Sequence, residues 1–495
     1  MNASKKILTI LVATLISAGL TAQIIKWERV YGASEYEYGR SIQQTIDGAY
    51  IVGGTSSSYS AATDMYLLRL NGNGSFRWHK VFGYGNDEWC MSVKQTADSG
   101  FILCGYTNSI GTGGYDVFLV KTDSLGNEMW HHTYGGPDWD FGTSVDTTSD
   151  GGYIITGSTY SYGAGGEDVL LLKTDGNGNE LWYNVFGGFS DENGTEVHQT
   201  IDDGGYIISG RTKSFSLGNY DMWVIKTTPT GDTAWTHTYG SPYEDGLNSV
   251  RQTIDSGYIV GGYTYMSHAH NESDMYARKL NKLGATTVIL YDSIATGNSG
   301  VQSILQTYDS CYFTLGSCDY CGGGQWDFQF IKWNSGFAYL NGGSRGSSKD
   351  ELAYQCQQTL DSGYVMVGNT TTWGNGKSDV FVVKLDKNFM YTALPIVGTN
   401  DLVREELDVS MNIFPNPAND LVILSADEKL FSGKGEMHLC DITGKQVLSE
   451  NEDLMKNVSG KIQFRFSVKD LASGIYLLSL ESDAGVFTRK LVVRH

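Results

Sequence analysis

One aspartate recurs seven times along this chain at an almost constant spacing. Successive copies are 52, 52, 53, 53, 53 and 52 residues apart, and each opens a mostly apolar run that ends in Lys or Arg. A second series, of aromatic residues, keeps nearly the same period. The aspartates are Asp64, Asp116, Asp168, Asp221, Asp274, Asp327 and Asp379, and the aromatics are Tyr50, Phe101, Tyr153, Tyr206, Tyr258, Tyr312 and Tyr364. Because a whole unit of about 50 residues is copied, the sequence predicts a repeat architecture.

The third copy shows what one unit contains. Residues 143–148 have the composition of a short strand, and Asp150-Gly-Gly-Tyr is typical of a tight turn into a returning strand over 153–159. Residues 168–173 form an unbroken apolar run, which favours a strand buried on both faces. A second tight turn leads to a fourth strand over 181–187. Each repeat therefore predicts four antiparallel strands.

Four strands in about 50 residues is the pattern of a propeller blade, since so small a sheet must stack on its neighbours to hide both faces. We therefore predict an all-β chain with a seven-bladed β-propeller over residues 23–391. The seventh copy has no convincing outer strand after Asp386, whereas an outer-type strand over 24–31 precedes the first hairpin. We expect that N-terminal strand to complete the last blade and close the ring.

The predicted outer strands carry a repeated tryptophan. The series consists of Trp27, Trp78, Trp130, Trp182 and Trp235. In the fifth copy the position is assigned to Val288 and in the sixth to Phe337, so blades five and six are the irregular ones.

Composition restricts the partners and the compartment. The net charge is −20, which disfavours nucleic acid and anionic membranes. Lys5 and Lys6 precede the apolar run 7–20 and a cleavage-type sequence ending at Ala22, so residues 1–22 are predicted to be a signal peptide. No cysteine follows that point to suggest a lipid anchor, and no later apolar run is long enough to span a bilayer. The seven cysteines have no regular spacing and predict no disulfide framework.

The repeat resembles a bacterial β-propeller repeat family, in which a Gly-Gly turn, a DGGYI-type hairpin and a D-x-x-x-x-K strand follow one another. The matching residues in the third copy are Gly135-Gly136, Asp150 to Ile154, and Asp168 to Lys173. The resemblance covers roughly residues 24–386 and implies the architecture; that family is not tied to one activity.

The period stops after Asp386, and residues 392–409 are predicted to be a linker. Residues 410–495 show new strand patterns that predict a small β-sandwich. This segment resembles the type A sorting domain of the type IX secretion system of Bacteroidetes. The residues that carry the resemblance include Pro415, Asn416, Pro417, Gly474 and Tyr476. It implies handling by the type IX secretion machinery and its sortase, and a secreted or outer-membrane surface location. An ordinary adhesive sandwich is the alternative.

Carboxylates precede the inner strands at the predicted mouth of the axial channel. They are Glu37, Glu88, Asp140, Glu192, Asp245 and Glu351, with Ser299 in the sixth copy. One hypothesis is a ring that binds a divalent cation or a cationic ligand. The other is a repeated cap to backbone N–H groups, which repetition favours. The seven opening aspartates are interpreted in the same way, as structural residues that order a turn.

Function is sought in residues that do not repeat. His268 and His270 in the fifth copy, and Cys318 and Cys321 in the sixth, are predicted on one face and suggest a transition-metal site. A local disulfide between the two cysteines and solvated histidines are the alternative. No cofactor is expected otherwise.

The sequence contains no nucleophile elbow, zinc-protease motif or phosphate loop, so no catalytic residue is assigned. Aromatic residues on the predicted upper loops, among them Trp89 and Trp139, suit stacking on sugar rings or peptide. We therefore expect a non-enzymatic module that binds glycan or protein. The alternative is an extracellular polysaccharide hydrolase or lyase on the same scaffold.

Overall fold

A computed structural model of the 495-residue chain describes two groups of residues. The first covers 27–265, 272–292, 297–319, 321 and 325–389; the second covers 412–414, 420–427, 436–441, 446–450, 455–456, 461–472, 474–482 and 485–493. The chain divides into two compact units, 25–401 and a unit containing 402–495, which are described separately. Among the described residues no helix is long and apolar enough to cross a membrane.

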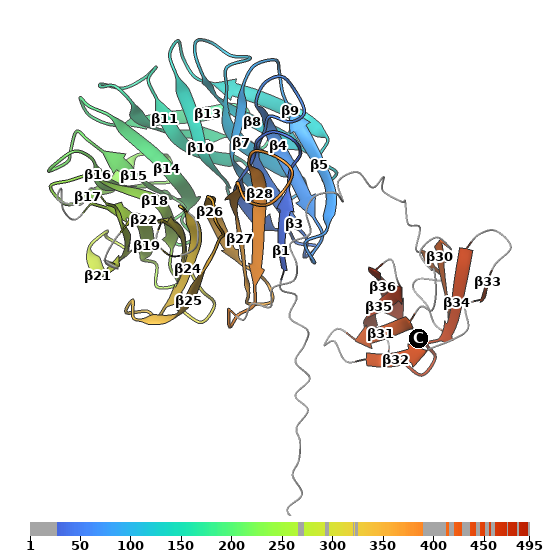
Figure 1. Cartoon of the computed structure of the whole chain (residues 1–495). Helices are drawn as coiled ribbons and strands as arrows, with labels where there is room; N and C mark the ends of the chain where they lie inside the picture. Colours follow the sequence, from blue (N-terminus) through green and yellow to red (C-terminus); the bar gives the residue numbers. More distant parts are fainter. Residues whose placement is uncertain are drawn as a thin grey trace, which may run out of the picture. The chain divides into compact units, whose positions relative to one another are not determined.

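Seven four-stranded antiparallel sheets make up the first unit (Figure 1). In blades one to three the strands are β2 (Glu37–Gln44), β3 (Tyr50–Ser56), β4 (Asp64–Leu70), β5 (Phe76–Phe82), β6 (Glu88–Gln95), β7 (Phe101–Thr107), β8 (Asp116–Thr122), β9 (Glu128–Tyr134), β10 (Asp140–Thr147), β11 (Tyr153–Thr159), β12 (Asp168–Thr174) and β13 (Glu180–Phe186). In blades four to seven they are β14 (Glu192–Gln199), β15 (Tyr206–Thr212), β16 (Asp221–Thr227), β17 (Thr233–Tyr239), β18 (Asp245–Gln252), β19 (Tyr258–Thr264), β20 (Asp274–Leu280), β21 (Thr286–Asp292), β22 (Ser299–Gln306), β23 (Tyr312–Cys318), β24 (Asp327–Trp333), β25 (Tyr339–Arg345), β26 (Glu351–Gln358), β27 (Tyr364–Thr370) and β28 (Asp379–Leu385).

The seven-bladed propeller is confirmed, and so is its mode of closure. The last blade has the strand order β1-β28-β27-β26, with β1 (Trp27–Tyr31) as its outer strand. The pairing is antiparallel, with Trp27 opposite Lys384. Glu28 on β1 is buried and accepts two hydrogen bonds from Arg345 of β25, at 2.6 and 2.7 Å. The N-terminal strand thus joins both the seventh and the sixth blade.

The hydrophobic core lies between neighbouring blades. In one cluster, Ile154 and Val169 of blade three pack with Val197 and Ile208 of blade four, and all four are fully or almost fully buried. The third strands supply apolar side chains to both faces, as their unbroken apolar runs predict. Each blade is therefore stabilised by its neighbours more than by itself.

The repeated tryptophan and the repeated aromatic meet across each regular interface. Trp182 of blade three, for example, lies 6.0 Å from Tyr206 of blade four, measured between ring centroids. Equivalent pairs are Trp27–Tyr50, Trp78–Phe101, Trp130–Tyr153 and Trp235–Tyr258. Both periodic aromatic series therefore serve blade packing.

The assignment of Phe337 to an outer strand is wrong. Phe337 lies in the turn before β25 and has a φ of 62°, at the place where the other blades have a glycine such as Gly74 or Gly178. It is nevertheless buried against Tyr312. The residue that pairs with Lys332 in the tryptophan position is Asn341. Blade six therefore has no aromatic residue there.

Phe389, which follows β28, occupies the space that this missing tryptophan leaves. Its ring lies 5.3 Å from Tyr364 and 5.7 Å from Phe313, parallel to both. Asn341 donates a hydrogen bond to the carbonyl of Asn388 next to it. The propeller fold thus includes the residues just after its last strand.

The basic residue next to the end of each third strand pairs with the aspartate of the hairpin turn in its own blade. Lys173 Nζ, for instance, lies 3.0 Å from Asp150 Oδ2, with the lysine buried and the aspartate half exposed. The other pairs are Arg69–Asp47, Lys121–Asp98, Lys226–Asp203, Lys279–Asp255, Lys332–Asp309 and Lys384–Asp361. The repeated charges are therefore structural.

The C-terminal unit contains two four-stranded sheets. One has the order β29 (Asn412–Phe414), β30 (Leu421–Asp427), β34 (Lys461–Ser467) and β33 (Met455–Lys456). The other has the order β32 (Gln446–Glu450), β31 (Glu436–Asp441), β35 (Gly474–Ser482) and β36 (Gly485–Val493). The strands agree with the all-β expectation; how the two sheets pack as a sandwich stays a prediction.

Candidate functional site

The predicted ring of carboxylates opens the inner strands at one edge of the blades, which we call the upper face. All six carboxylates are fully buried. Glu192 accepts hydrogen bonds from the backbone N–H of Gly188 at 2.7 Å and from Thr212 Oγ1 at 3.0 Å. Each of the other carboxylates likewise accepts a hydrogen bond from the backbone N–H of the residue four positions before it. These carboxylates are Glu37, Glu88, Asp140, Asp245 and Glu351. These contacts are of the kind that the capping hypothesis describes, in which each carboxylate binds a backbone N–H group.

The aspartates that open the third strands lie beside this ring. Asp168 is buried, and its Oδ2 accepts the backbone N–H of Ala164 at 3.0 Å. Its Oδ1 lies against Gly187, where an added Cβ would be 1.5 Å from Asp168 Oδ1 and 2.8 Å from Glu192 Oε2. Glycine is therefore required at the end of the outer strand, because two carboxylates of adjacent blades fill the space of a side chain. Similar close approaches occur at Gly32, Gly135 and Gly240.

Burial of these acids changes their protonation. Burial, and then the charge of Asp140, raise the pKa of Asp116 to about 6, although a backbone N–H from Thr112 lowers it. Burial, with Glu37 as the adjacent charge, likewise raises the pKa of Asp379 to about 6. Because the folded-state pKa exceeds the unfolded one, these groups contribute stability below about pH 4, and that contribution is lost as the pH rises through about 6.

We expect Asp116→Asn to reduce the pH dependence of unfolding. The denaturation midpoint of the variant should fall less steeply than that of the wild type between about pH 4 and pH 7, since the variant has no proton to lose. Asp98→Asn is the control: although burial opposes it, hydrogen bonds from Lys121 and Thr96 lower the pKa of Asp98 to about 2, so its effect belongs below about pH 4. Identical slopes for wild type and Asp116→Asn in urea titrations would contradict this assignment.

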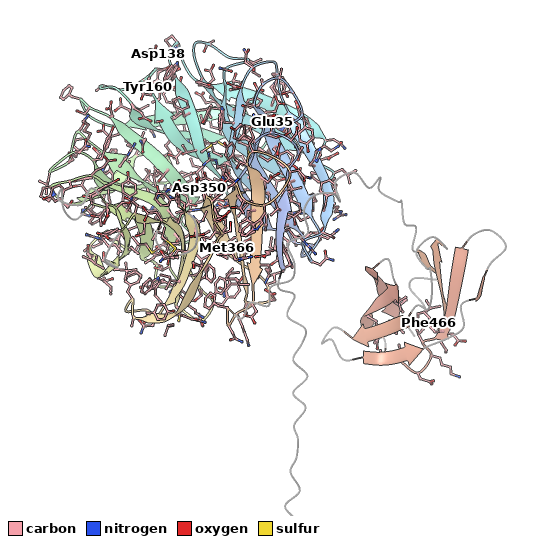
Figure 2. All side chains as sticks on the ribbon, in the orientation of Figure 1. Glu35, Asp138, Tyr160, Asp350, Met366 and Phe466 are labelled. Atoms are coloured by element: carbon pink, nitrogen blue, oxygen red, sulfur yellow. A yellow bond between two sulfur atoms is a disulfide. The ribbon has the colours of Figure 1, made fainter. Side chains whose placement is uncertain are left out.

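Aromatic side chains form a continuous group on the upper face of blades two and three. Trp89 stacks on Tyr106 at 6.2 Å, and Tyr106 meets Phe141 edge-on at 5.0 Å. Trp139 lies 6.3 Å from Phe141 and 6.2 Å from Tyr160. Trp139 is 54% exposed and Tyr160 43% exposed, so two ring faces remain in contact with solvent. Figure 2 labels Tyr160 next to Asp138, on adjoining loops. We call Trp89, Tyr106, Trp139, Phe141 and Tyr160 the aromatic group.

Charged residues from blades three to five continue the upper face from the aromatic group. Tyr160 reaches Glu167 Oε2 at 3.5 Å, and the backbone N–H of Glu167 donates to Asp191 at 3.4 Å. Tyr220 OH in turn donates to the other oxygen of Asp191 at 3.4 Å. Burial raises the pKa of Glu167, partly opposed by Ser158 and Arg211.

Arg211 is the cation of this charged group. Its Nη1 lies 3.2 Å from Glu244 Oε1 and 3.1 Å from Tyr263 OH, and its guanidinium lies 4.3 Å from the ring of Tyr220. Its side chain is 31% exposed and that of Glu244 36% exposed, so both keep hydrogen-bonding capacity toward solvent. We call Glu167, Asp191, Arg211 and Glu244 the charged group. A sugar ring on the aromatic side has donors and acceptors for its hydroxyls on the charged side.

Sequence reasoning placed Trp89 and Trp139 on this face but missed the charged group. Two columns of the repeat vary between blades. The residues before the third strands are Thr63, Tyr115, Glu167, Tyr220, Ser273, Trp326 and Ser378, and those before the inner strands are Tyr36, Asp87, Trp139, Asp191, Glu244, Asn298 and Asp350. Comparing the copies column by column for positions that vary would have revealed both columns.

The metal hypothesis is tested only in part by the structure. His268 and His270 lie outside the described residues. Cys318 and Cys321 form a disulfide with each other, which is the alternative considered from the sequence. Among the described residues no group of three or more His, Cys, Asp or Glu side chains is arranged to hold a metal ion.

The sorting-motif residues fall in the C-terminal unit. Pro415, Asn416 and Pro417 lie outside the described residues. Gly474 and Tyr476 belong to β35, and Tyr476 OH donates to the carbonyl of Ala472 at 2.8 Å.

Two family models match the chain. Residues 412–494 match the secretion system C-terminal sorting domain, and residues 47–76 match a β-propeller domain of unknown function (DUF5122). No curated protein matches it.

Solved structures are similar at low identity. An acylaminoacyl peptidase of Pyrococcus horikoshii is 9% identical, with a TM-score of 0.42, over 81% of this chain and 59% of that one. Drosophila Plexin A in complex with Semaphorin 1b is 8% identical, with a TM-score of 0.44, over 72% of this chain and 86% of that one. The β-propeller domain of the Trilobed protease from Pyrococcus furiosus is 8% identical, with a TM-score of 0.42, over 73% of this chain and 100% of that one. This chain thus spans about three fifths of the peptidase's length, and these similarities carry no inference about activity.

Fold and family match together define the class: a seven-bladed β-propeller followed by a type IX secretion sorting domain. The sorting domain indicates secretion through the type IX system to the cell surface or the extracellular space.

Proposed function

We propose that the protein is a non-enzymatic binding module that recognises an extracellular glycan with the upper face of its propeller. Within the chain, residues 1–22 serve as signal peptide, 23–391 as the binding propeller, 392–409 as linker and 410–495 as the sorting domain, which engages the type IX machinery and its sortase.

The aromatic group beside the charged group is the observation that supports this function. Exposed aromatic rings bind the apolar faces of sugars, and they lose little conformational entropy when they do so. The fixed hydrogen bonds of Arg211 to Glu244 and Tyr263 hold the adjacent polar groups in one arrangement. Preorganised groups of this kind make binding specific. The repeated carboxylates, by contrast, are buried and contact the protein's own donors.

Trp139→Ala is expected to weaken glycan binding about tenfold, which corresponds to loss of about 1.4 kcal/mol from one stacked ring. The ligand is first found by screening the propeller-bearing protein against neutral and acidic polysaccharides, and the affinity of the variant is then measured by calorimetry. Tyr339→Ala removes an aromatic residue of similar exposure, 61%, from the outer strand β25, and should leave the affinity unchanged. Equal weakening by both variants would rule out the upper face.

A polysaccharide hydrolase is the second candidate, and the carboxylates Glu167 and Asp191 favour it. An acid with a raised pKa close to a second carboxylate is the arrangement that glycosidases use. The two functions separate in one assay, since every glycan that binds is also tested for release of reducing ends. Product release that disappears in Glu167→Gln would replace the binding proposal by the enzymatic one.

A further inference from the structure

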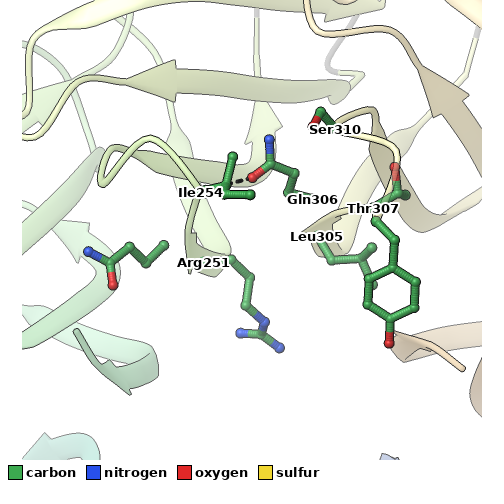
Figure 3. A pocket seen from close by; sticks show the side chains of 8 residues that line it. Arg251, Ile254, Leu305, Gln306, Thr307 and Ser310 are labelled. Carbon is green, nitrogen blue, oxygen red and sulfur yellow. Dashed lines mark hydrogen bonds between the residues drawn. The ribbon is translucent and has the colours of Figure 1, made fainter. Parts of the chain in front are cut away.

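The end of the axial channel opposite to the upper face carries two pockets that share lining residues. One, of about 220 Å³, is lined by inner-strand residues of five blades, among them Gln43, Lys94, Arg251 and Gln357. The other, of about 330 Å³, lies between blades five and six (Figure 3). Arg251, Leu305, Gln306 and Tyr308 line both. We call the pair the lower pocket. The sizes suit a ligand no larger than about one sugar unit.

The glutamines of the lower pocket present hydrogen-bond donors. Gln43 Oε1 accepts the backbone N–H of Gln95 at 2.7 Å, and Gln355 Oε1 accepts that of Ile42 at 2.8 Å. Gln357 Oε1 accepts the N–H of Gln44 in the same way. A backbone N–H can only donate, so each amide oxygen must face the neighbouring blade, and each amide nitrogen is left on the other side. No described residue accepts a hydrogen bond from these three nitrogens.

Two positive charges lie at the lower pocket, and only one of them forms a direct ion pair. Arg251 Nη1 lies 2.5 Å from Glu196 Oε1, and Glu196 also accepts the backbone N–H of Val250. The nearby Asp146 lies 2.8 Å from His198 Nδ1. Although burial raises it, the pKa of Asp146 is lowered to about 2 by His198 and also by the charge of Lys94. Lys94 forms no ion pair or hydrogen bond with any described residue, and no Asp or Glu is among the residues that line either pocket.

These residues do not repeat between blades. The inner-strand column that contains them consists of Gln43, Lys94, Asp146, His198, Arg251, Leu305 and Gln357. A column used only for blade packing would carry one residue type, as the aspartates and tryptophans do. The variation indicates that this ring has a role of its own.

We propose that the lower pocket binds the carboxylate of an acidic sugar such as a uronate, at a site separate from the upper face. Lys94 supplies the charge, and the amide nitrogens of Gln43, Gln355 and Gln357 donate to the carboxylate and hydroxyl oxygens. Tyr308, 67% exposed, offers a face for the sugar ring. Lys94, the cation without a direct ion pair, matches a singly charged carboxylate, whereas a phosphate dianion would bring a second negative charge that has no direct partner there.

The test is calorimetric titration of the full chain with galacturonate, with galactose as the neutral sugar and inorganic phosphate as the other anion. Wild type should bind galacturonate in preference to both. Lys94→Met keeps the aliphatic stem without the charge and should weaken galacturonate binding by about tenfold or more, while Lys94→Arg should retain it. Lys80→Met, on outer strand β5, is the matched control and should bind as wild type does.

The outcomes that overturn the proposal are specific. They are no saturable binding of galacturonate, equal affinity for galactose, tighter binding of phosphate, or unchanged affinity in Lys94→Met with a wild-type melting curve. Trp139→Ala should leave galacturonate binding here unchanged, so a failure of the upper-face proposal is distinguishable from a failure of this one.

Discussion

Trp27→Ala should lower the free energy of unfolding of the propeller by about 3–5 kcal/mol, the cost typical of truncating a buried tryptophan. Trp27 is 3% exposed and packs in a cluster with Tyr50, Leu70 and Val382, which come from the first and the last blade. Its removal leaves a cavity at the only interface that depends on β1 pairing with β28. Urea denaturation followed by tryptophan fluorescence and circular dichroism measures the change.

Trp139→Ala is the control for this loss of a tryptophan. Trp139 is 54% exposed, so its removal should change stability by no more than about 0.5 kcal/mol. Equal destabilisation by the two variants would contradict the structural role assigned to the buried Trp27.

Gly187→Ala is expected to destabilise the propeller by about 3 kcal/mol, the upper part of the usual range for overpacking. The new methyl group would lie 1.5 Å from Asp168 Oδ1, and the aspartate is held by the backbone N–H of Ala164 and cannot turn away freely. Thermal and urea denaturation give the size of the loss.

A double variant separates the collision from a general loss of glycine. Gly187→Ala combined with Asp168→Ala should be less destabilised than the sum of the two single variants, because the colliding oxygen is gone. Gly300→Ala, where the nearest atom to an added Cβ is 3.4 Å away, should be close to neutral. Strict additivity in the cycle would show that the carboxylate is not the reason for the glycine.

The blade count and the closing strand could be predicted because both follow from a period and a register. The seven aspartates give the number of third strands, and each blade needs three further strands. The missing outer strand of blade seven therefore pointed to residues 24–31, and the described part of that strand is Trp27–Tyr31. Residues that pack the strands and blades together occur once in each blade, and such a repeat is visible in a sequence.

Phe337 shows where such reasoning fails. Its hydrophobicity suggested a tryptophan substitute, but Phe337 has the positive φ that glycine has in the equivalent turns. The actual substitute, Phe389, comes from beyond the last strand of another blade. A contact made by a residue outside the repeat has no period, so the sequence pattern alone did not predict it.

The candidate sites were predicted least well for a related reason. The sequence pattern did not indicate Lys94, Arg251 or Arg211, because each occurs once in its column, although all three lie on strands whose positions were predicted correctly. Which side chains meet across the channel depends on the ring geometry. Only the carboxylate ring and the two tryptophans, Trp89 and Trp139, which lie at or next to the start of the inner strands, could be placed beforehand.

The position of β1 also sets an order of events during folding. Its partner β28 is the last propeller strand along the chain, so it is the last to become available when the chain emerges from its N-terminus. Until then Trp27 and Val30 have no sheet to join, and β2 to β5 have no neighbour on one side. A nascent propeller is therefore an open arc with two unpartnered faces, and it becomes resistant to proteases and to association with other chains only when its two ends meet.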